Sequence, residues 1–148
     1  MSLIETLQQD MKQALKNRDE LKLSTIRLVL SSVSYARIAK GEQLTDDEVL
    51  GVISREAKQR RETIDSAITG GRTDIAEREQ AELDILQTYL PKQLDFSEIE
   101  DIVREIAAEV GVTDIKDRGK LMGPVMQKVK GKADGKIVNQ VVEKVLRG

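Results

Sequence analysis

The spacing of the apolar residues is the feature that most constrains the fold. They recur at positions i, i+3, i+4 and i+7, which places them on one face of an α-helix. The last two stripes of the chain show the pattern most directly: Met122, Val125, Met126 and Val129, then Val138, Val141, Val142 and Val145. Valine is a mediocre helix former, so a strand over residues 137–146 is the alternative there, although the spacing favours a helix. Because no stretches pair well as strands, the sequence predicts an all-α protein.

Capping residues and glycines divide the chain into seven expected helices. Six of the apolar stripes follow a residue that can cap a helix N-terminus: Ser2, Asp19, Thr45, Thr73, Ser97 and Asp134. Three of these caps are completed as capping boxes by Glu5, Glu48 and Glu100. Glycines are expected to end four of the helices, at Gly41, Gly70, Gly111 and Gly131. Pro124 is expected to kink the sixth helix or to delay its start until about Met122.

A short linker at residues 91–96 is the expected domain boundary. Pro91 should end the fourth helix, because the residue before a proline disfavours helical backbone angles. We therefore expect a four-helix N-terminal domain over residues 1–92 and a three-helix C-terminal domain over residues 93–148.

The composition bears on location. The chain has 148 residues, of which 39% are apolar and 34% charged, and it has no cysteine. It contains no run of about 18 apolar residues, and its first residues lack the apolar stretch of a signal peptide. We therefore expect a cytoplasmic protein that does not bind a membrane.

Catalytic arrangements are difficult to build from these residues. Without histidine or cysteine, imidazole bases, Ser-His-Asp triads and thiolate metal sites are excluded. Residues 131–137 come nearest to a phosphate-binding loop, but they are one residue short between glycines and lack the final hydroxyl. A group of carboxylates lies where a solvated helix face is expected: Glu77, Glu79, Glu82 and Asp84. We predict no catalytic residue, no metal site and no cofactor.

The net charge of −2 hides an asymmetry along the chain. Residues 93–115 contain one base and seven acids, whereas residues 116–148 contain nine bases and three acids. Such a local excess of positive charge favours a local contact with a polyanion. The alternative is that the acidic and basic helices neutralise each other within one small domain.

Five lysines of the basic segment are the candidate nucleic-acid-binding residues: Lys120, Lys128, Lys130, Lys132 and Lys136. They can contact phosphates as flexible point charges. The three aromatic residues lie outside this segment, which excludes base stacking and favours recognition of a folded RNA by its backbone and shape. Two observations favour a structural role instead. Lysines near a helix C-terminus also complement its free carbonyls, and Asp134 places negative charge where a phosphate would dock.

A second basic cluster lies in the third helix, at Arg55, Lys58, Arg60 and Arg61. Its residues alternate with acids, and the pairs Glu56–Arg60 and Lys58–Glu62 have the i, i+4 spacing of surface ion pairs. The pattern favours a solvated face. Docking of a partner protein is the alternative, which an exposed apolar strip on this helix would favour.

Several of these stretches resemble the GatB/YqeY family. The match is most specific at Lys-Gly-Lys-Ala, residues 130–133, within the glycine-rich and lysine-rich stretch 119–135. Residues 55–62 (REAKQRRE) and 82–94 (ELDILQTYLPKQL) resemble the charged helix and the inter-domain signature of stand-alone YqeY proteins. Residues 24–28 (STIRL) are also similar, so the resemblance covers nearly the whole chain.

The resemblance implies a function in association with tRNA. From about residue 97, the chain is similar to the tail of the B subunit of glutamyl/aspartyl-tRNA amidotransferases, which engages tRNA; the large catalytic domain of that subunit has no counterpart here. An adaptor that binds tRNA or another structured RNA is the preferred interpretation. The family also implies association with carbon–nitrogen ligase activity that uses glutamine as amido donor. The alternatives are a protein-interaction module acting through the N-terminal helices and an accessory subunit of such a ligase complex.

Overall fold

The computed structural model describes residues 1–148 and contains seven α-helices, one short 3₁₀ helix and no strand. The elements in chain order are α1 (Leu3–Lys16), α2 (Glu20–Lys40), α3 (Asp46–Thr69), α4 (Thr73–Gln87), α5 (Phe96–Val110), η1 (Ile115–Asp117), α6 (Arg118–Val129) and α7 (Gly135–Arg147). The prediction of an all-α protein is confirmed. The strand considered for residues 137–146 is wrong, because this stretch lies within α7.

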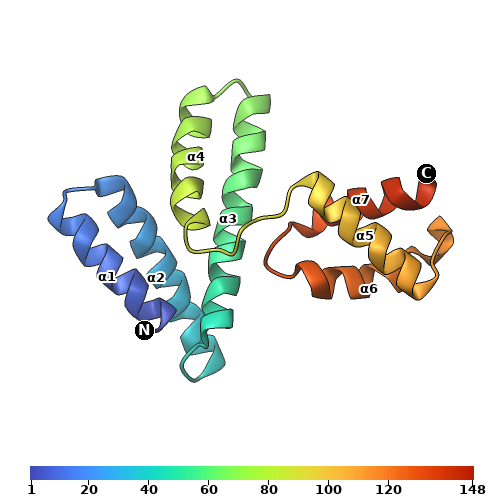
Figure 1. The fold of residues 1–148 in the computed structure, drawn as a ribbon. Coiled ribbons are helices and arrows are strands. Elements are labelled where there is room, and N and C mark those ends of the chain that lie inside the picture. The colour runs from blue at the N-terminus through green and yellow to red at the C-terminus, as the bar shows by residue number, and fades with distance from the viewer. The chain divides into compact units, whose positions relative to one another are not determined.

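The chain divides into two compact units, residues 1–90 (unit 1) and residues 91–148 (unit 2). In unit 1, α1 and α2 form one helical hairpin and α3 and α4 form another; unit 2 contains α5, η1, α6 and α7 (Figure 1). That residues 1–92 and 93–148 are separate folding domains stays a prediction.

Unit 1 buries one apolar stripe from each of its long helices. On α2 the buried residues include Ile26, Val29 and Val33, as the periodicity predicts, and on α3 they include Val49 and Ile53. Each such side chain contributes roughly 1.5–3 kcal/mol when it leaves water. The helical spacing predicts that Ile68 lies on the same face of α3 as Ile64, but Ile68 is 62% exposed, because it lies in the last turn of the helix.

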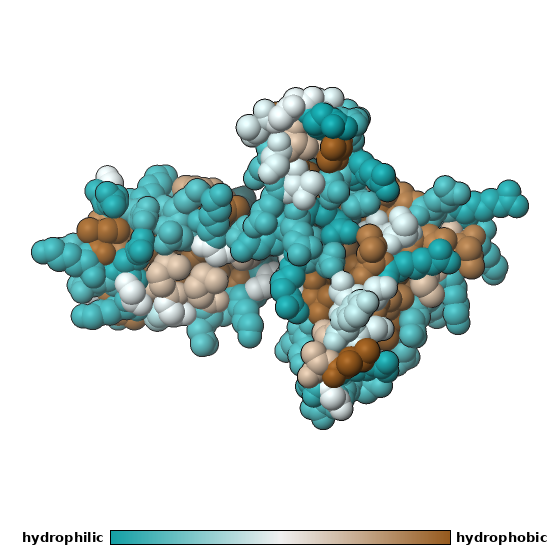
Figure 2. Space-filling view, turned by 180° about the vertical axis from the view of Figure 1, so that it is seen from behind, coloured by the Kyte–Doolittle hydropathy of each residue, from teal (hydrophilic) through white to brown (hydrophobic).

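Unit 2 buries only aliphatic side chains. They come from α5, α6, α7 and the loop after α5: Ile99, Val103, Ile106, Ala107, Val112, Leu121, Val125, Val129, Val138, Val141 and Val142. The predicted stripes of α6 and α7 supply most of this core. Figure 2 shows one face of the molecule, which is mainly hydrophilic with hydrophobic patches.

Local capping rules locate most helix ends. Asp19 and Thr45 cap α2 and α3 as predicted, and Thr45 forms a complete capping box with Glu48. The box predicted at Ser97 and Glu100 is wrong, since Asp95 and Glu98 form it two residues earlier. Both pairs satisfy the sequence rule, and the earlier start lengthens the helix. The N-cap predicted at Thr73 is also wrong, because Arg72 occupies that position without a side-chain hydrogen bond.

Pro124 lies inside α6, which begins at Arg118 and not near Met122. A proline at this position removes the hydrogen bond that its nitrogen would donate to the carbonyl of Lys120. Lys120 and Pro124 are both exposed, so water can satisfy that carbonyl and the helix continues through the proline.

Candidate nucleic-acid interface

The tight turn between α6 and α7 has a defined backbone. Lys130 is the C-cap of α6, and Gly131 follows with φ of 75°, a left-handed conformation that favours glycine. The N–H of Lys132 donates to the carbonyl of Val129 at 2.8 Å. The prediction that Gly131 ends this helix is confirmed.

The segment before α5 fixes this turn in place. The N–H of Leu94 donates to the carbonyl of Lys132 at 2.8 Å, and the side-chain amide of Gln93 donates to the carbonyl of Gly131 at 3.0 Å. The same amide donates to the carbonyl of Pro91 at 3.0 Å. Two carbonyls of the turn therefore accept hydrogen bonds from the segment before α5. These bonds hold the backbone from which the lysine side chains project.

Four of the five candidate lysines surround this turn. Lys128 lies in the last turn of α6, Lys130 and Lys132 lie in the connection, and Lys136 lies in the first turn of α7. All four are exposed, and none of them forms an ion pair. The arrangement leaves their ammonium groups free to meet an anion from solvent.

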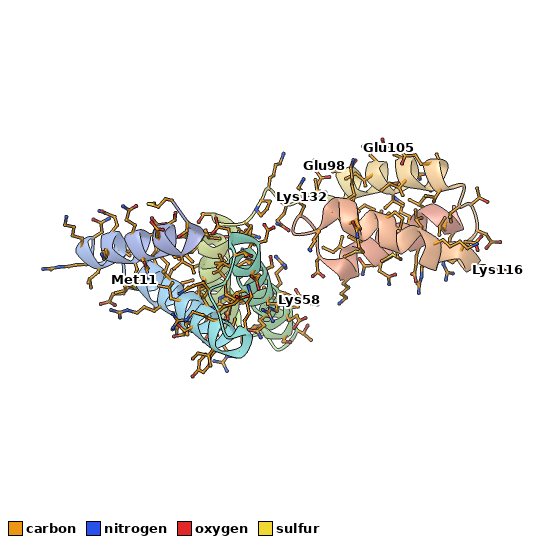
Figure 3. The ribbon with its side chains drawn as sticks, turned by 90° about the horizontal axis from the view of Figure 1, so that it is seen from below. Met11, Lys58, Glu98, Glu105, Lys116 and Lys132 are labelled. Carbon is orange, nitrogen blue, oxygen red and sulfur yellow. The ribbon has the colours of Figure 1, made fainter.

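Lys120 does not belong to this group. It lies near the start of α6, about 12 Å along the helix axis from Lys128. Its ammonium group lies 3.5 Å from the carboxylate of Asp117. Figure 3 shows Lys116 and Lys132 at opposite ends of unit 2. The four lysines around the turn form what we call the turn cluster, and Lys120 lies outside it.

Asp134 occupies the N-terminus of α7. Its side chain accepts the N–H of Lys136 at 3.0 Å, so the predicted cap is confirmed. This carboxylate takes the position at which a helix N-terminus would bind a phosphate. An anion can therefore meet the lysine side chains of the turn cluster but not the end of the helix.

Only one base of the basic segment forms an ion pair with an acid of helix α5. The ammonium group of Lys144 lies 3.2 Å from the carboxylate of Glu100, which also accepts from Arg104 at 2.8 Å. Hydrogen bonds from Arg104 and then from Lys144 lower the pKa of Glu100 below its ordinary value. Arg118 pairs with Glu143 at 2.5 Å, within the basic segment.

An aromatic ring also lies against the basic segment, contrary to the expectation from the sequence. The Lys144 nitrogen lies 5.1 Å from the centre of the Phe96 ring, within the range of a cation–π interaction. Phe96 is 43% exposed and begins α5, 48 positions before Lys144 in the chain. Base stacking on this unit is therefore not excluded by its residues.

In the second basic cluster Arg55 and Lys58 are exposed, as predicted for a solvated face, but Arg60 is not. Arg60 is only 6% exposed, and it donates to Glu56 at 2.7 Å and to Glu82 of α4 at 3.2 Å. The predicted Glu56–Arg60 pair is confirmed, but it is partly buried, and the predicted Lys58–Glu62 pair does not form. Glu82 was assigned to a solvated face, and it is 7% exposed. The sequence rule considers neighbours within one helix and so missed the contact with α4.

The carboxylates of the chain do not gather into a site for a metal ion: no group of three or more has a suitable arrangement. None of the helices combines the length and the hydropathy that a membrane-spanning helix requires.

Several curated proteins with similar sequences carry the same name. The chain is 31% identical over 144 residues to "Altered inheritance of mitochondria protein 41, mitochondrial" of Pyrenophora tritici-repentis. The aligned residues cover 95% of this chain and 78% of that protein. It is 31% identical to the protein of that name from Vanderwaltozyma polyspora, over 75% of this chain and 64% of the relative. It is 33% identical to the Candida glabrata protein of the same name, over 68% of this chain and 56% of that protein. The chain thus spans about two thirds or less of two of these relatives.

These names contradict the predicted cytoplasmic location, because all three relatives are named as mitochondrial proteins. The prediction used the lack of cysteine and of an apolar span. Neither property separates the cytosol from other compartments in which proteins do not need disulfides.

The model of one family matches nearly the full length of the chain, over residues 4–146, which include both units and the turn cluster. The description of this family is "Yqey-like protein". The chain belongs to the Yqey-like protein family.

Proposed function

We propose that this chain is an RNA-binding adaptor without catalytic machinery of its own. In this proposal the turn cluster contacts the phosphate backbone of a structured RNA, of which tRNA is the preferred example. The observation that carries the proposal is that Lys128, Lys130, Lys132 and Lys136 are exposed, unpaired and attached to a turn that hydrogen bonds hold in place.

The resemblance to the tail of the amidotransferase B subunit supports the choice of tRNA. In this proposal unit 2 engages tRNA as that tail does, and the catalysis of a carbon–nitrogen ligase would require a separate partner. The purified chain, incubated with misacylated tRNA, ATP and glutamine, is expected to show no transamidation. Turnover by this chain alone would overturn the proposal of an adaptor.

The salt dependence of tRNA binding tests the role of the turn cluster. Four lysines on four phosphates would give a slope of log K against log [salt] of about −3, since each contact contributes roughly 0.7–0.9. In the variant Lys128→Glu/Lys130→Glu/Lys132→Glu the slope should flatten to about −1, because one of the four contacts is left. Fluorescence anisotropy of labelled tRNA between low and high KCl measures both slopes.

A matched variant in unit 1 separates site-specific contact from net charge. Lys12, Lys16 and Lys58 are also exposed and unpaired, and their replacement by Glu changes the net charge by the same amount. This control should keep the slope of the wild type. Equal binding by all three proteins would mean that the turn cluster does not contact the tRNA.

A further inference from the structure

Helix α2 presents a second apolar stripe on the side opposite to its buried one. Leu21, Leu28, Tyr35 and Ile38 are 36%, 51%, 77% and 72% exposed. Their spacing of seven, seven and three residues places them along one face of the helix. We call these four residues the α2 stripe. On α3, where an apolar strip would have favoured protein interaction, the only large exposed hydrophobic residue is Ile68.

Shallow grooves lie on both sides of the α2 stripe. The groove towards α1 has a volume of about 610 Å³, and its lining includes Met11, which Figure 3 labels, together with Leu30 and Ile38. The groove towards α3 has a volume of about 390 Å³, and its lining includes Val52. Tyr35 lines both grooves and so forms the ridge between them. A ridge between two apolar grooves is a surface against which another helix can pack.

The rims of these grooves are positively charged. Arg27 lines the groove towards α1 and Arg55 the groove towards α3, and neither forms an ion pair. The acid on the rim, Glu56, is already engaged, because one carboxylate oxygen accepts from Ser32 at 2.7 Å and the other from Arg60 at 2.7 Å. Helix α2 contains four bases and one acid, whereas unit 1 as a whole contains thirteen bases and sixteen acids. Positive charge is thus concentrated beside the stripe.

We infer that the α2 stripe and its two grooves bind an acidic amphipathic helix of a partner protein. Apolar side chains of that helix would enter the grooves beside Tyr35, and its acids would meet Arg27 and Arg55. The stripe from Leu21 to Ile38 is about 25 Å long, so it matches a partner helix of about 17 residues. This inference is independent of the proposed RNA contact, which concerns unit 2.

The charge of the rim selects this occupant over two others. A second copy of the chain would bring the same unpaired arginines, and no added acid, to the interface, and an excess of like charge opposes association. An RNA would satisfy Arg27 and Arg55 but would leave the aliphatic side chains of the stripe, such as Ile38, without apolar contacts. An acidic amphipathic helix satisfies both the apolar and the cationic parts of the surface.

Two synthetic peptides test the inference on the full chain. Both are helical, about 18 residues long, and carry leucines at i, i+3, i+4 and i+7; one has glutamates and the other lysines at the flanking positions. Titration of the ¹⁵N-labelled protein should shift amide signals of α2 and of both grooves with the acidic peptide. The lysine peptide should bind at least about tenfold more weakly, because its charge repels the rim.

Substitutions at exposed positions show whether the stripe is the site. The double variant Tyr35→Ser/Ile38→Ser should bind the acidic peptide about tenfold or more weakly, because both exposed apolar side chains beside the grooves are lost. Ile68→Ser, at an apolar residue of similar exposure on α3, is the matched control and should leave binding unchanged. Circular dichroism melts establish that each variant is folded.

Four results would overturn the inference. They are the absence of shifts at millimolar acidic peptide, equal affinity for both peptides, shifts that lie outside α2 and its grooves, and an equal effect of Ile68→Ser. Sedimentation of the protein alone adds a fifth. A dimer that Tyr35→Ser and Ile38→Ser abolish would assign the surface to a second copy of the chain. Failure of any kind here leaves the salt slope of tRNA binding unaffected, so the two proposals are tested separately.

Discussion

Unit 1 buries Thr25, Arg60 and Glu82 among its apolar residues, whereas every buried residue of unit 2 is aliphatic. In unit 1, the Arg60 guanidinium joins α3 to α4 through Glu82, and Glu56 accepts from Ser32 of α2. These directional contacts link three helices. In unit 2 the ion pairs lie at the surface, and the free lysines surround a turn.

This difference predicts which substitutions each unit should tolerate. A buried ion pair adds little when it is complete, but the loss of one partner leaves the other charge uncompensated in the interior. Unit 1 should therefore be sensitive to the removal of a single charge. Unit 2 has no such charge, and its turn depends on backbone conformation, so it should be sensitive to substitution of the left-handed glycine.

The largest effect is expected for Arg60→Met, which leaves the buried carboxylate of Glu82 without its main partner. The free energy of unfolding should fall by about 3–5 kcal/mol. Both tyrosines of the chain, Tyr35 and Tyr89, lie in unit 1, so urea unfolding followed by tyrosine fluorescence reports on this unit.

Two variants sharpen this test. Arg78→Ala removes an exposed partner of Glu82 at 3.8 Å and should cost no more than about 1 kcal/mol. The double variant Arg60→Met/Glu82→Met should recover part of the loss, because it removes both members of the pair. If Arg60→Met is as stable as Arg78→Ala, the network does not hold unit 1 together and the contrast between the units fails.

A smaller effect is expected in unit 2 from Gly131→Ala. With φ of 75° at this position, a Cβ atom should cost about 1–2 kcal/mol. Gly119→Ala, in the first turn of α6 with open space around the added Cβ, should instead stabilise by roughly 0.4–1 kcal/mol. Far-UV circular dichroism during urea unfolding measures both changes, while tyrosine fluorescence should not move. The same sign for the two alanines would contradict the role given to the turn.

Sequence rules predicted the parts of this fold that depend on neighbouring residues. The stripe of α6, the glycine at 131 and the cap at Asp134 are set within one or two helical turns. The contact of Arg60 with Glu82 joins residues 22 positions apart, and that of Phe96 with Lys144 joins residues 48 apart. Such pairs depend on how the helices pack against each other, and the periodicity of a single helix does not specify this packing.

The α2 stripe shows a different limit of periodicity. Helix α2 has apolar residues on two faces, with Val29 on the buried one and Leu28 on the exposed one. The period of 3.6 residues predicted the buried stripe, but it does not say what a second apolar stripe on the exposed face contacts. The candidate lysines show the same limit, because local rules placed four of them around one turn but did not separate Lys120 from the others.

Each unit has one complete capping box, and a comparison of these boxes leads to the smallest effect. Thr45 and Glu48 form the box of α3, and Asp95 and Glu98 form that of α5. Only Glu48 also has a lysine partner, because the ammonium group of Lys40 lies 2.6 Å from its carboxylate. Hydrogen bonds from Lys40 and then from the Thr45 N–H lower the pKa of Glu48 from 4.5 to about 2.

This shift predicts how the stability of unit 1 depends on pH. Since the pKa of Glu48 is lower in the folded state, its contribution is fully present above about pH 4.5 and is lost as the pH falls towards about 2. Glu48→Gln should therefore lower the urea midpoint of tyrosine fluorescence at about pH 7, and its difference from the wild type should disappear near pH 2. Glu42→Gln, which removes only the longer contact of 3.5 Å to Lys40, should change the midpoint less. A difference between Glu48→Gln and the wild type that persists at the acid end would mean that packing of the side chain, and not its charge, stabilises this end of α3.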